Sequence, residues 1–176
     1  SKFEPKLHEW LKDKKYWKPS VLNFTQNWLK GGLQDRAITR DIEWGIKVPV
    51  EGFEDKRIYV WFDAVIGYLS ASKEWSQKKD KPDKWKEWWH DKKVKHYYFL
   101  AKDNIPFHSI IWPSILMGYD DTLNLPYDIP ANEYLTLKGE QCSKSRGVGI
   151  WVPEILKRFD ADVVRYYLSI NMPENK

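Results

Sequence analysis

The chain has 176 residues, enough for one sizeable domain, and its 42% hydrophobic and 31% charged residues exclude a disordered chain and favour a soluble globular protein. The net charge of +4 permits a polyanionic partner but does not require one. The single cysteine, Cys142, excludes an internal disulfide and a cysteine-based structural zinc site.

Two amphipathic helices are predicted at the start of the chain. Apolar residues recur at helical spacing from Lys2 to Asp13, and a second helix is predicted to begin at Pro19. Gly31-Gly32 is expected to end that helix, because glycine tolerates the left-handed backbone found at helix C-termini. Residues 33–56 show no clear period, so turns and irregular structure are expected there.

Three apolar runs are predicted to be strands: Ile58 to Phe62, Tyr97 to Leu100 and Tyr134 to Leu137. The first run is continuously apolar and rich in strand-forming residues, as expected of a strand buried in a parallel sheet. Asp63 directly follows it and is a good N-cap, so a helix is predicted to begin there.

Further helices are predicted around the second and third strands. A short one starts at Pro82-Asp83, and one from Phe107 to Met117 contains Pro113, which should kink or interrupt it. Pro153 begins another helix, and Asp160 caps the last. This alternation predicts an α/β fold with a parallel sheet, in which ligands bind at the carboxyl ends of the strands.

Lysines crowd between Lys73 and Lys95, but acidic residues are interleaved with them. Mixed signs at helical spacing are typical of a solvated helix face, so this interpretation is preferred over an RNA-binding patch. The four histidines are too scattered to predict a metal site. No apolar run reaches the length of a membrane-spanning helix and the N-terminus does not look like a signal peptide, so a cytoplasmic protein without a membrane partner is expected.

Three short segments follow the predicted strands and carry candidate site residues. In "AKDNIPFH" (101–108), the carboxylate of Asp103 can accept hydrogen bonds from the vicinal hydroxyls of a ribose, or it can cap a helix. His108 can donate to a ligand or simply pack, and the residues alone favour packing. In "WFDAVIGY" (61–68), aromatic and small residues form either an apolar pocket or part of the core.

The third segment is "SKSRG" (143–147). Lys144 is a mobile cation that can follow charge developing on a phosphate, and the neighbouring serines and glycine leave the loop free to move. Such strings are also common on protein surfaces. Its position between a predicted strand and a predicted helix is what favours a phosphate-binding role.

In their order and spacing, these segments resemble the second half of the catalytic domain of the methionyl-tRNA synthetase family, within the class I aminoacyl-tRNA synthetases. The likeness covers nearly the whole chain from Pro19 onward, and the loop 141–145 corresponds to the family's KMSKS signature. The blocks that carry it are "GLQDRAITRDIEWGI" (32–46), "YVWFDAVIGYLS" (59–70), "KDNIPFHSIIWPSILMG" (102–118), "PANEYLTLKGEQCSKSRGVGIW" (130–151) and "ADVVRYYLSINMPE" (161–174).

The resemblance implies a division of the chain into three parts. Residues 1–18 would end the family's connective insertion, residues 19–152 would form the second half of the nucleotide-binding domain, and residues 153–176 would begin the helical stem-contact region. The fold would then be half of a doubly wound, Rossmann-like, HUP-type parallel sheet with flanking helices. The family's HIGH signature would lie before residue 1, so the chain alone is expected to be inactive. The zinc-bearing part of the insertion is not matched either, and no metal ligand is expected in this segment.

The resemblance also implies a reaction. ATP, bound with Mg²⁺, would activate methionine as methionyl-adenylate, and the methionyl group would pass to tRNA(Met). Positioning and charge stabilisation would carry the catalysis. The resemblance assigns the catalytic role to Lys144 with Ser143 and Ser145, ATP or adenylate binding to Asp103, Ala101, Lys102, Ile38, Leu135 and Lys144, and methionine binding to Trp61, Ala64, Tyr68, Phe107 and His108.

The sequence departs from the family pattern at four positions. Gln141 and Cys142 stand where the signature has lysine and methionine, Val65 stands where proline is usual, and Ala101 stands where glycine is usual. Two alternatives therefore stay open: a non-catalytic paralogue or relic that acts as a binding module, and a class I synthetase for another apolar amino acid.

Overall fold

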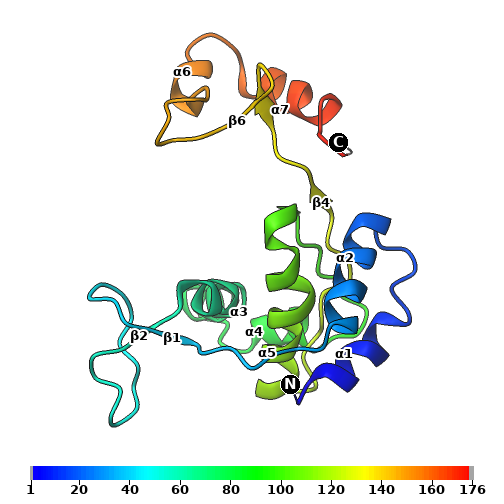
Figure 1. Cartoon of the computed structure of the whole chain (residues 1–176), viewed down its shortest axis with the longest axis vertical. Coiled ribbons are helices and arrows are strands. Elements are labelled where there is room, and N and C mark those ends of the chain that lie inside the picture. The colour runs from blue at the N-terminus through cyan, green and yellow to red at the C-terminus, as the bar shows by residue number, and fades with distance from the viewer. Residues whose placement is uncertain (1, 175–176) are drawn as a thin grey trace.

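A computed structural model describes residues 2–174, and helices carry most of the ordered structure (Figure 1). The strands are two residues long and pair in three separate two-stranded units. The helices are α1 (Glu4–Leu11), α2 (Pro19–Lys30), α3 (Val60–Lys78), α4 (Lys84–Trp89), η1 (Lys102–Asn104), η2 (Phe107–Ile111), α5 (Trp112–Tyr119), α6 (Val152–Ile155) and α7 (Ala161–Ile170). The strands are β1 (Thr39–Arg40), β2 (Arg57–Ile58), β3 (Leu100–Ala101), β4 (Ala131–Asn132), β5 (Thr136–Leu137) and β6 (Glu140–Gln141).

The strands β3 and β4 pair in parallel. Leu100 lies opposite Ala131 and Ala101 opposite Asn132, and a parallel bridge between Tyr97 and Asp128 extends the pairing toward the amino ends of the strands. Helices flank this pair, which confirms the predicted α/β class with a parallel sheet. The other two units, β1–β2 and β5–β6, are antiparallel.

The predicted first strand, residues 58–62, is wrong. Ile58 belongs to β2 and pairs antiparallel with Thr39, and α3 begins at Val60 with Tyr59 as its N-cap. Asp63 therefore lies in the first turn of the helix rather than at its cap. A short apolar run does not distinguish a buried strand from a helix start, and here the buried residues Val65 and Leu69 continue the pattern at helical spacing.

The predicted third strand is also wrong in its pairing. Within residues 134–137 only Thr136–Leu137 is a strand, and it pairs antiparallel with β6. The parallel partner of β3 is Ala131–Asn132, which directly follows Pro130. A two-residue strand next to a proline shows too little alternation to be recognised from the sequence.

Several predicted helices are confirmed. They include the two opening helices, the short helix after Pro82-Asp83, and the last helix, whose N-cap Asp160 accepts a hydrogen bond from the Asp162 amide at 2.8 Å. At the end of α2 the positive φ of Gly32, 76°, confirms the left-handed turn expected there.

The expected interruption near Pro113 takes the form of a π-helical turn. Residues Phe107–Ile111 form η2, and α5 continues from it with Pro113 in its first turn. The amide of Trp112 donates to the carbonyl of Phe107, five residues back. Pro113 comes next and has no amide hydrogen to donate, so the helix changes pitch where its hydrogen-bond pattern is interrupted. The helices η2 and α5 therefore form one continuous helix, called the η2–α5 rod below, and Phe107 and His108 lie at its start.

Two apolar clusters hold the helices against β3 and β4. The first joins α1 and α2 to the strands, and the second joins α3 and α4 to α5. Leu100 packs against both clusters, and the η2–α5 rod contributes Ile110 to the first and Trp112 and Leu116 to the second. The rod is thus fixed from two sides.

Residues 134–174 form a separate, open part of the molecule at the far end of Figure 1. No residue in this range is buried. A backbone hydrogen bond from Glu133 to the carbonyl of Pro173, 2.8 Å long, ties its end back to β4.

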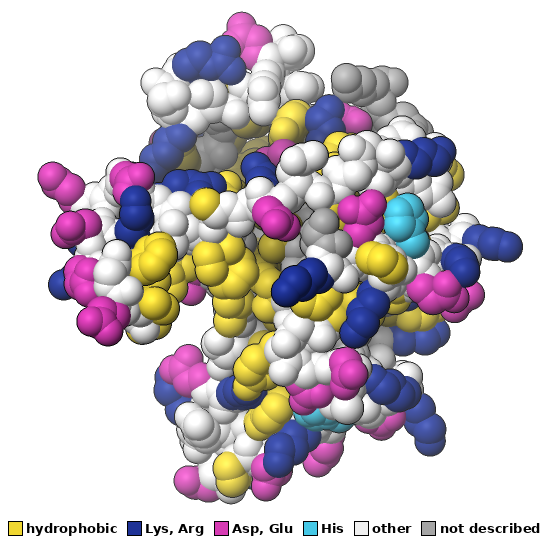
Figure 2. All heavy atoms as spheres, turned by 60° about the horizontal axis from the view of Figure 1, so that its bottom comes forward, with side chains coloured by type: hydrophobic (Ala, Val, Ile, Leu, Met, Phe, Trp, Pro, Cys, Tyr) yellow, Lys and Arg dark blue, Asp and Glu magenta, His cyan; other side chains and the backbone are white. Residues whose placement is uncertain are grey.

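The face seen in Figure 2 is mixed in charge, with basic and acidic side chains interspersed around a central hydrophobic area. In the lysine-rich segment, Lys78 pairs with Glu74, Lys84 with Glu87 and Lys86 with Asp83. These ion pairs confirm the prediction of a solvated helix face there.

Candidate active site

The carboxyl end of β3 carries a polar segment, as expected for a parallel sheet. Ala101 ends the strand, and Lys102 and Asp103 follow in η1. Lys102 forms an ion pair with Glu133, just beyond the end of β4, so its charge already has a partner across the sheet. Its ammonium also lies 4.9 Å from the ring centre of Tyr134.

Asp103 is exposed beside this ion pair. It lies inside η1 and makes no capping hydrogen bond, so the N-cap alternative is wrong. One carboxylate oxygen accepts a hydrogen bond from the side-chain amide of Asn104 at 3.2 Å. The carboxylate is therefore accessible to an external donor such as a pair of vicinal hydroxyls.

An aromatic cluster lies where α3 meets η2. Trp61 and Phe107 are stacked, with ring centres 4.9 Å apart and planes 22° apart. The Tyr68 hydroxyl lies 2.9 Å from Nε2 of His108. Ala64 lies between Trp61 and Tyr68 on the same face of α3, because spacings of three and four residues share one helical face. The structure thus gathers the predicted methionine-binding residues into one cluster.

Hydrogen bonds determine which nitrogen of His108 carries the proton. Nδ1 lies 2.9 Å from the carbonyl oxygen of Asn104, which can only accept, so Nδ1 is the protonated nitrogen. Nε2 of the neutral ring then accepts from the Tyr68 hydroxyl. Burial lowers the pKa of His108, and burial raises the pKa of Tyr68, so the pair is neutral at pH 7.

Two buried aromatic residues behind this cluster were not predicted as site residues. Trp112 donates its indole hydrogen to the hydroxyl of Tyr98 at 2.9 Å, and both side chains are buried. Burial raises the pKa of Tyr98 to about 12. The sequence does hold a signal for Trp112, because it follows His108 by four residues and so lies near it on the same rod.

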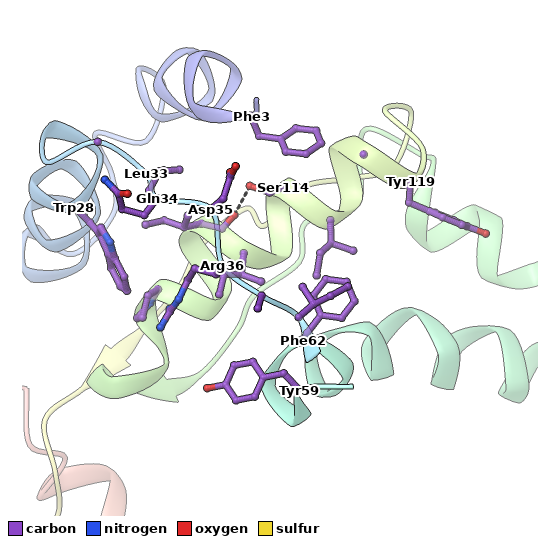
Figure 3. Close-up of a pocket in the computed structure, with 18 of the residues that line it drawn as sticks. Phe3, Trp28, Leu33, Gln34, Asp35, Arg36, Tyr59, Phe62, Ser114 and Tyr119 are labelled. Atoms are coloured by element: carbon purple, nitrogen blue, oxygen red, sulfur yellow. Dashed lines mark hydrogen bonds between the residues drawn. The ribbon is translucent and has the colours of Figure 1, made fainter. Parts of the chain in front are cut away.

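A separate cavity of about 650 Å³ lies between the extended segment 33–40, the start of α3 and the η2–α5 rod (Figure 3). Its walls are mainly apolar, with Trp28, Leu33 and Phe62 among the lining residues. Ile38, a predicted adenine neighbour, lines this cavity and is 48% exposed. In the described part of the chain, residues 2–174, none of the five predicted methionine-binding residues lines this cavity.

Leu135, the other predicted adenine neighbour, lies on the segment between β4 and β5 and is 49% exposed. The structure therefore places Ile38 and Leu135 on different segments, each with an accessible apolar side chain.

The segment 136–148 forms two successive tight turns. Lys138 and Gly139 have positive φ angles of 52° and 81° and join β5 to β6. Ser143 and Val148 then exchange backbone hydrogen bonds of 2.8 and 3.0 Å, which close the loop that carries Lys144. This loop is called the signature hairpin below, residues 140–148.

The signature hairpin carries two cations, Lys144 and Arg146. Lys144 is exposed and has no ion-pair partner within residues 2–174. Arg146 donates to the carbonyl of Gln141 at 3.3 Å, and the hydroxyls of Ser143 and Ser145 lie 3.2 Å apart. The arrangement leaves the Lys144 ammonium available to an anion.

Within residues 2–174, no group of three or more histidine, cysteine or carboxylate side chains is arranged to hold a metal ion. In the same part of the chain, no helix combines the length and apolar character that crossing a membrane requires.

Comparison with known proteins decides the family. The whole chain, residues 1–176, matches the family model described as tRNA synthetases class I (M). The chain belongs to this family. It is 62% identical to a methionine–tRNA ligase of Thermoplasma volcanium over 98% of its own length and 32% of that protein, and 57% identical to the enzyme of Thermoplasma acidophilum over 97% and 31%. It therefore spans about a third of these curated relatives.

A solved structure shows the same fold. Mycobacterium tuberculosis methionyl-tRNA synthetase in complex with methionyl-adenylate superposes with a TM-score of 0.75 at 28% identity, over 96% of this chain and 31% of that one. This likeness confirms the predicted membership of a class I synthetase catalytic domain.

Proposed function

We propose that the protein containing this chain activates methionine with ATP, bound with Mg²⁺, and transfers the methionyl group to tRNA(Met) in the cytoplasm. The observation that carries the proposal is the aromatic cluster of Trp61, Tyr68, Phe107 and His108. His108 donates to the carbonyl of Asn104, which directly follows the exposed Asp103, so the cluster is joined to the segment that carries this carboxylate. The relative of known structure is described as bound to methionyl-adenylate, a ligand with both an apolar thioether chain and a ribose.

The aromatic cluster suits the side chain of methionine. A thioether contacts aromatic rings favourably, and the Trp61–Phe107 stack provides two such rings. Ala64 leaves room beside them because its side chain is small. Tyr68 and His108 fix each other by their hydrogen bond and close the cluster at its polar end.

The ATP side of the site involves Asp103, Ala101, Lys102, Ile38 and Leu135. Asp103 would accept hydrogen bonds from the ribose hydroxyls. Ala101 ends β3 beside it and brings one methyl group, where the family's glycine has none, to the backbone that faces the nucleotide. Lys102 joins the ends of β3 and β4 through its ion pair with Glu133. Ile38 and Leu135 offer apolar surface to the adenine.

The reaction needs little covalent work from the protein. A carboxylate oxygen of methionine attacks the α-phosphorus of ATP, the new oxygen–phosphorus bond forms as the bond to pyrophosphate breaks, and pyrophosphate leaves with the bonding electrons. The exposed Lys144, between Ser143 and Ser145, would stabilise the charge on the phosphates as this occurs. A hydroxyl of the terminal adenosine of tRNA then attacks the methionyl carbonyl carbon. An ester bond forms as the bond between that carbon and the phosphate oxygen breaks, and AMP leaves.

The three-part division of the chain belongs to the same proposal. Residues 1–18 include α1, residues 19–152 include the parallel pair and the signature hairpin, and residues 153–176 include α7. We expect residues 153–176 to contact the tRNA stem side of the complete enzyme, and residues 1–176 alone to show no activation.

The alternative of another apolar amino acid rested on Val65. Val65 is only 2% exposed and belongs to the second apolar cluster, so its side chain is not available to a ligand at the aromatic cluster. This placement supports methionine as the substrate.

The test is amino-acid-dependent ATP–pyrophosphate exchange by the complete protein. We expect exchange with methionine but not with leucine, isoleucine or valine. Lys144→Ala should lower kcat by roughly a hundredfold, as removal of one charge contact in a transition state does. Lys157→Ala, also exposed, is the matched control and should leave kcat unchanged. Absence of methionine-dependent exchange in the complete protein would favour the binding-module alternative.

A further inference from the structure

Tyr98 lies behind the aromatic cluster, where it contacts Tyr68, His108 and Trp112. It precedes β3, and its backbone amide donates to the carbonyl of Asp128 at 3.0 Å, which fixes the main chain against the neighbouring segment. Its side chain is 8% exposed. Tyr98 is therefore held rigidly and has little access to a ligand.

The hydroxyl of Tyr98 fixes Trp112. It accepts the indole hydrogen of Trp112 at 2.9 Å, and Trp112 is 1% exposed. A buried donor without a partner is costly, so this hydrogen bond determines where the indole ring lies. Trp112 in turn lies 6.2 Å from the ring centre of Tyr68.

The ring of Tyr98 supports both members of the hydrogen-bonded pair. It meets Tyr68 edge to face, with centres 5.0 Å apart and planes at 72°, and lies 5.5 Å from His108. Tyr68 itself is 44% exposed, so its outer face is available to a ligand while Tyr98 holds its inner face. One buried ring thus supports the two residues that close the polar end of the cluster.

We propose that Tyr98 is a positioning residue for side-chain recognition, which acts through Trp112, Tyr68 and His108 rather than by contact with the substrate. The proposal rests on the proposed function, because it assigns the amino-acid side chain to the aromatic cluster. Losing the Tyr98 hydroxyl would free the indole of Trp112 to reorient, and Tyr68, whose ring centre lies 6.2 Å from that of Trp112, would lose a fixed neighbour. Binding of the amino acid would weaken, while the phosphate chemistry at the signature hairpin would not change.

A purely structural role makes a different prediction. If Tyr98 only fills the core, its hydroxyl affects stability, and KM for methionine stays the same in the folded protein. The neighbouring Tyr97 provides a matched control, since it is 50% exposed and its ring packs on Tyr127, away from the cluster. Both tyrosines can be changed to phenylalanine, which removes one oxygen and keeps the ring.

The experiment is steady-state pyrophosphate exchange by the complete protein with the variants Tyr98→Phe and Tyr97→Phe. We expect Tyr98→Phe to raise KM for methionine roughly five- to tenfold with less than a twofold change in kcat. Tyr97→Phe should leave both unchanged. An unchanged KM in Tyr98→Phe, or equal effects of the two variants, would overturn the proposal.

A second comparison tests whether Tyr98 acts through Trp112. In the background Trp112→Phe the indole donor is absent, so adding Tyr98→Phe should raise KM by less than twofold further. Full additivity of the two changes would contradict action through Trp112. Lack of methionine-dependent exchange in the unmodified complete protein would instead refute the proposed function itself.

Discussion

The packed body, residues 2–133, and the open part, residues 134–174, differ in what holds them. In the body, two apolar clusters pack against the η2–α5 rod from opposite sides, whereas the open part has no buried residue. The aromatic cluster belongs to the body, and Lys144 belongs to the open part. Recognition of a side chain benefits from a rigid wall, and a cation that follows charge developing on phosphates benefits from freedom to move.

The largest expected difference between the two regions is in stability. Leu116→Ala, at a side chain that is 1% exposed, should lower the free energy of unfolding by roughly 2–5 kcal/mol because it leaves a cavity. Leu168→Ala on α7, at a side chain that is 45% exposed, should change it by no more than about 0.5 kcal/mol. Denaturant unfolding of the complete protein measures both, and equal losses would show that the open part is as tightly packed as the body.

A second contrast, between local and long-range signals, decides what the sequence could predict. Helices with a clear apolar period and a recognisable start, such as α2 after Pro19 and α7 after Asp160, were predicted well because these signals are local. The strands were predicted poorly. Ile58 and Ala131 each belong to a two-residue strand, and only the partner segment, far away in the sequence, decides how such a strand pairs.

The site divides in a similar way. Residues on one helical face or next to each other, such as Tyr68 with Ala64 or Phe107 with His108, could be grouped from their spacing and from the family resemblance. Tyr98 was missed because its role depends on a hydrogen bond to Trp112, fourteen residues away. A buried residue that supports a site leaves no chemical signal in the sequence and looks like ordinary core.

The next prediction concerns recognition by the body. Trp61→Ala removes one ring of the stack with Phe107 and should raise KM for methionine roughly tenfold, with a smaller effect on kcat. Trp75→Ala on the same helix is the control, because Trp75 is similarly exposed but packs on Trp88. Pyrophosphate exchange measures both variants. A KM that is the same in Trp61→Ala and Trp75→Ala would place the methionine site elsewhere.

The smallest expected effect concerns pH and the body. Burial lowers the pKa of His108 below its value of about 6.5 in an unfolded chain, so the unfolded state binds its proton first as the pH falls. The stability that neutral His108 provides is thus present above about pH 6.5 and is lost as the pH falls through the folded pKa. Burial lowers the pKa of His96 in the same way, so it contributes to the same trend.

Thermal unfolding measures this effect. The Tm of the complete protein should fall by a few degrees between about pH 7.5 and pH 5.5, and His108→Gln should make the curve flatter. A variant curve parallel to the original would show that His108 does not contribute through its buried, neutral form.

We propose that the body recognises methionine and that the signature hairpin serves the phosphates. The most direct test is the Kd for methionine alone, measured by calorimetry on the complete protein with and without Lys144→Ala. We predict a Kd within about twofold of the unmodified protein, because Lys144 is exposed on the open part and has no role in the aromatic cluster. A Kd about tenfold weaker or more in Lys144→Ala would contradict the division.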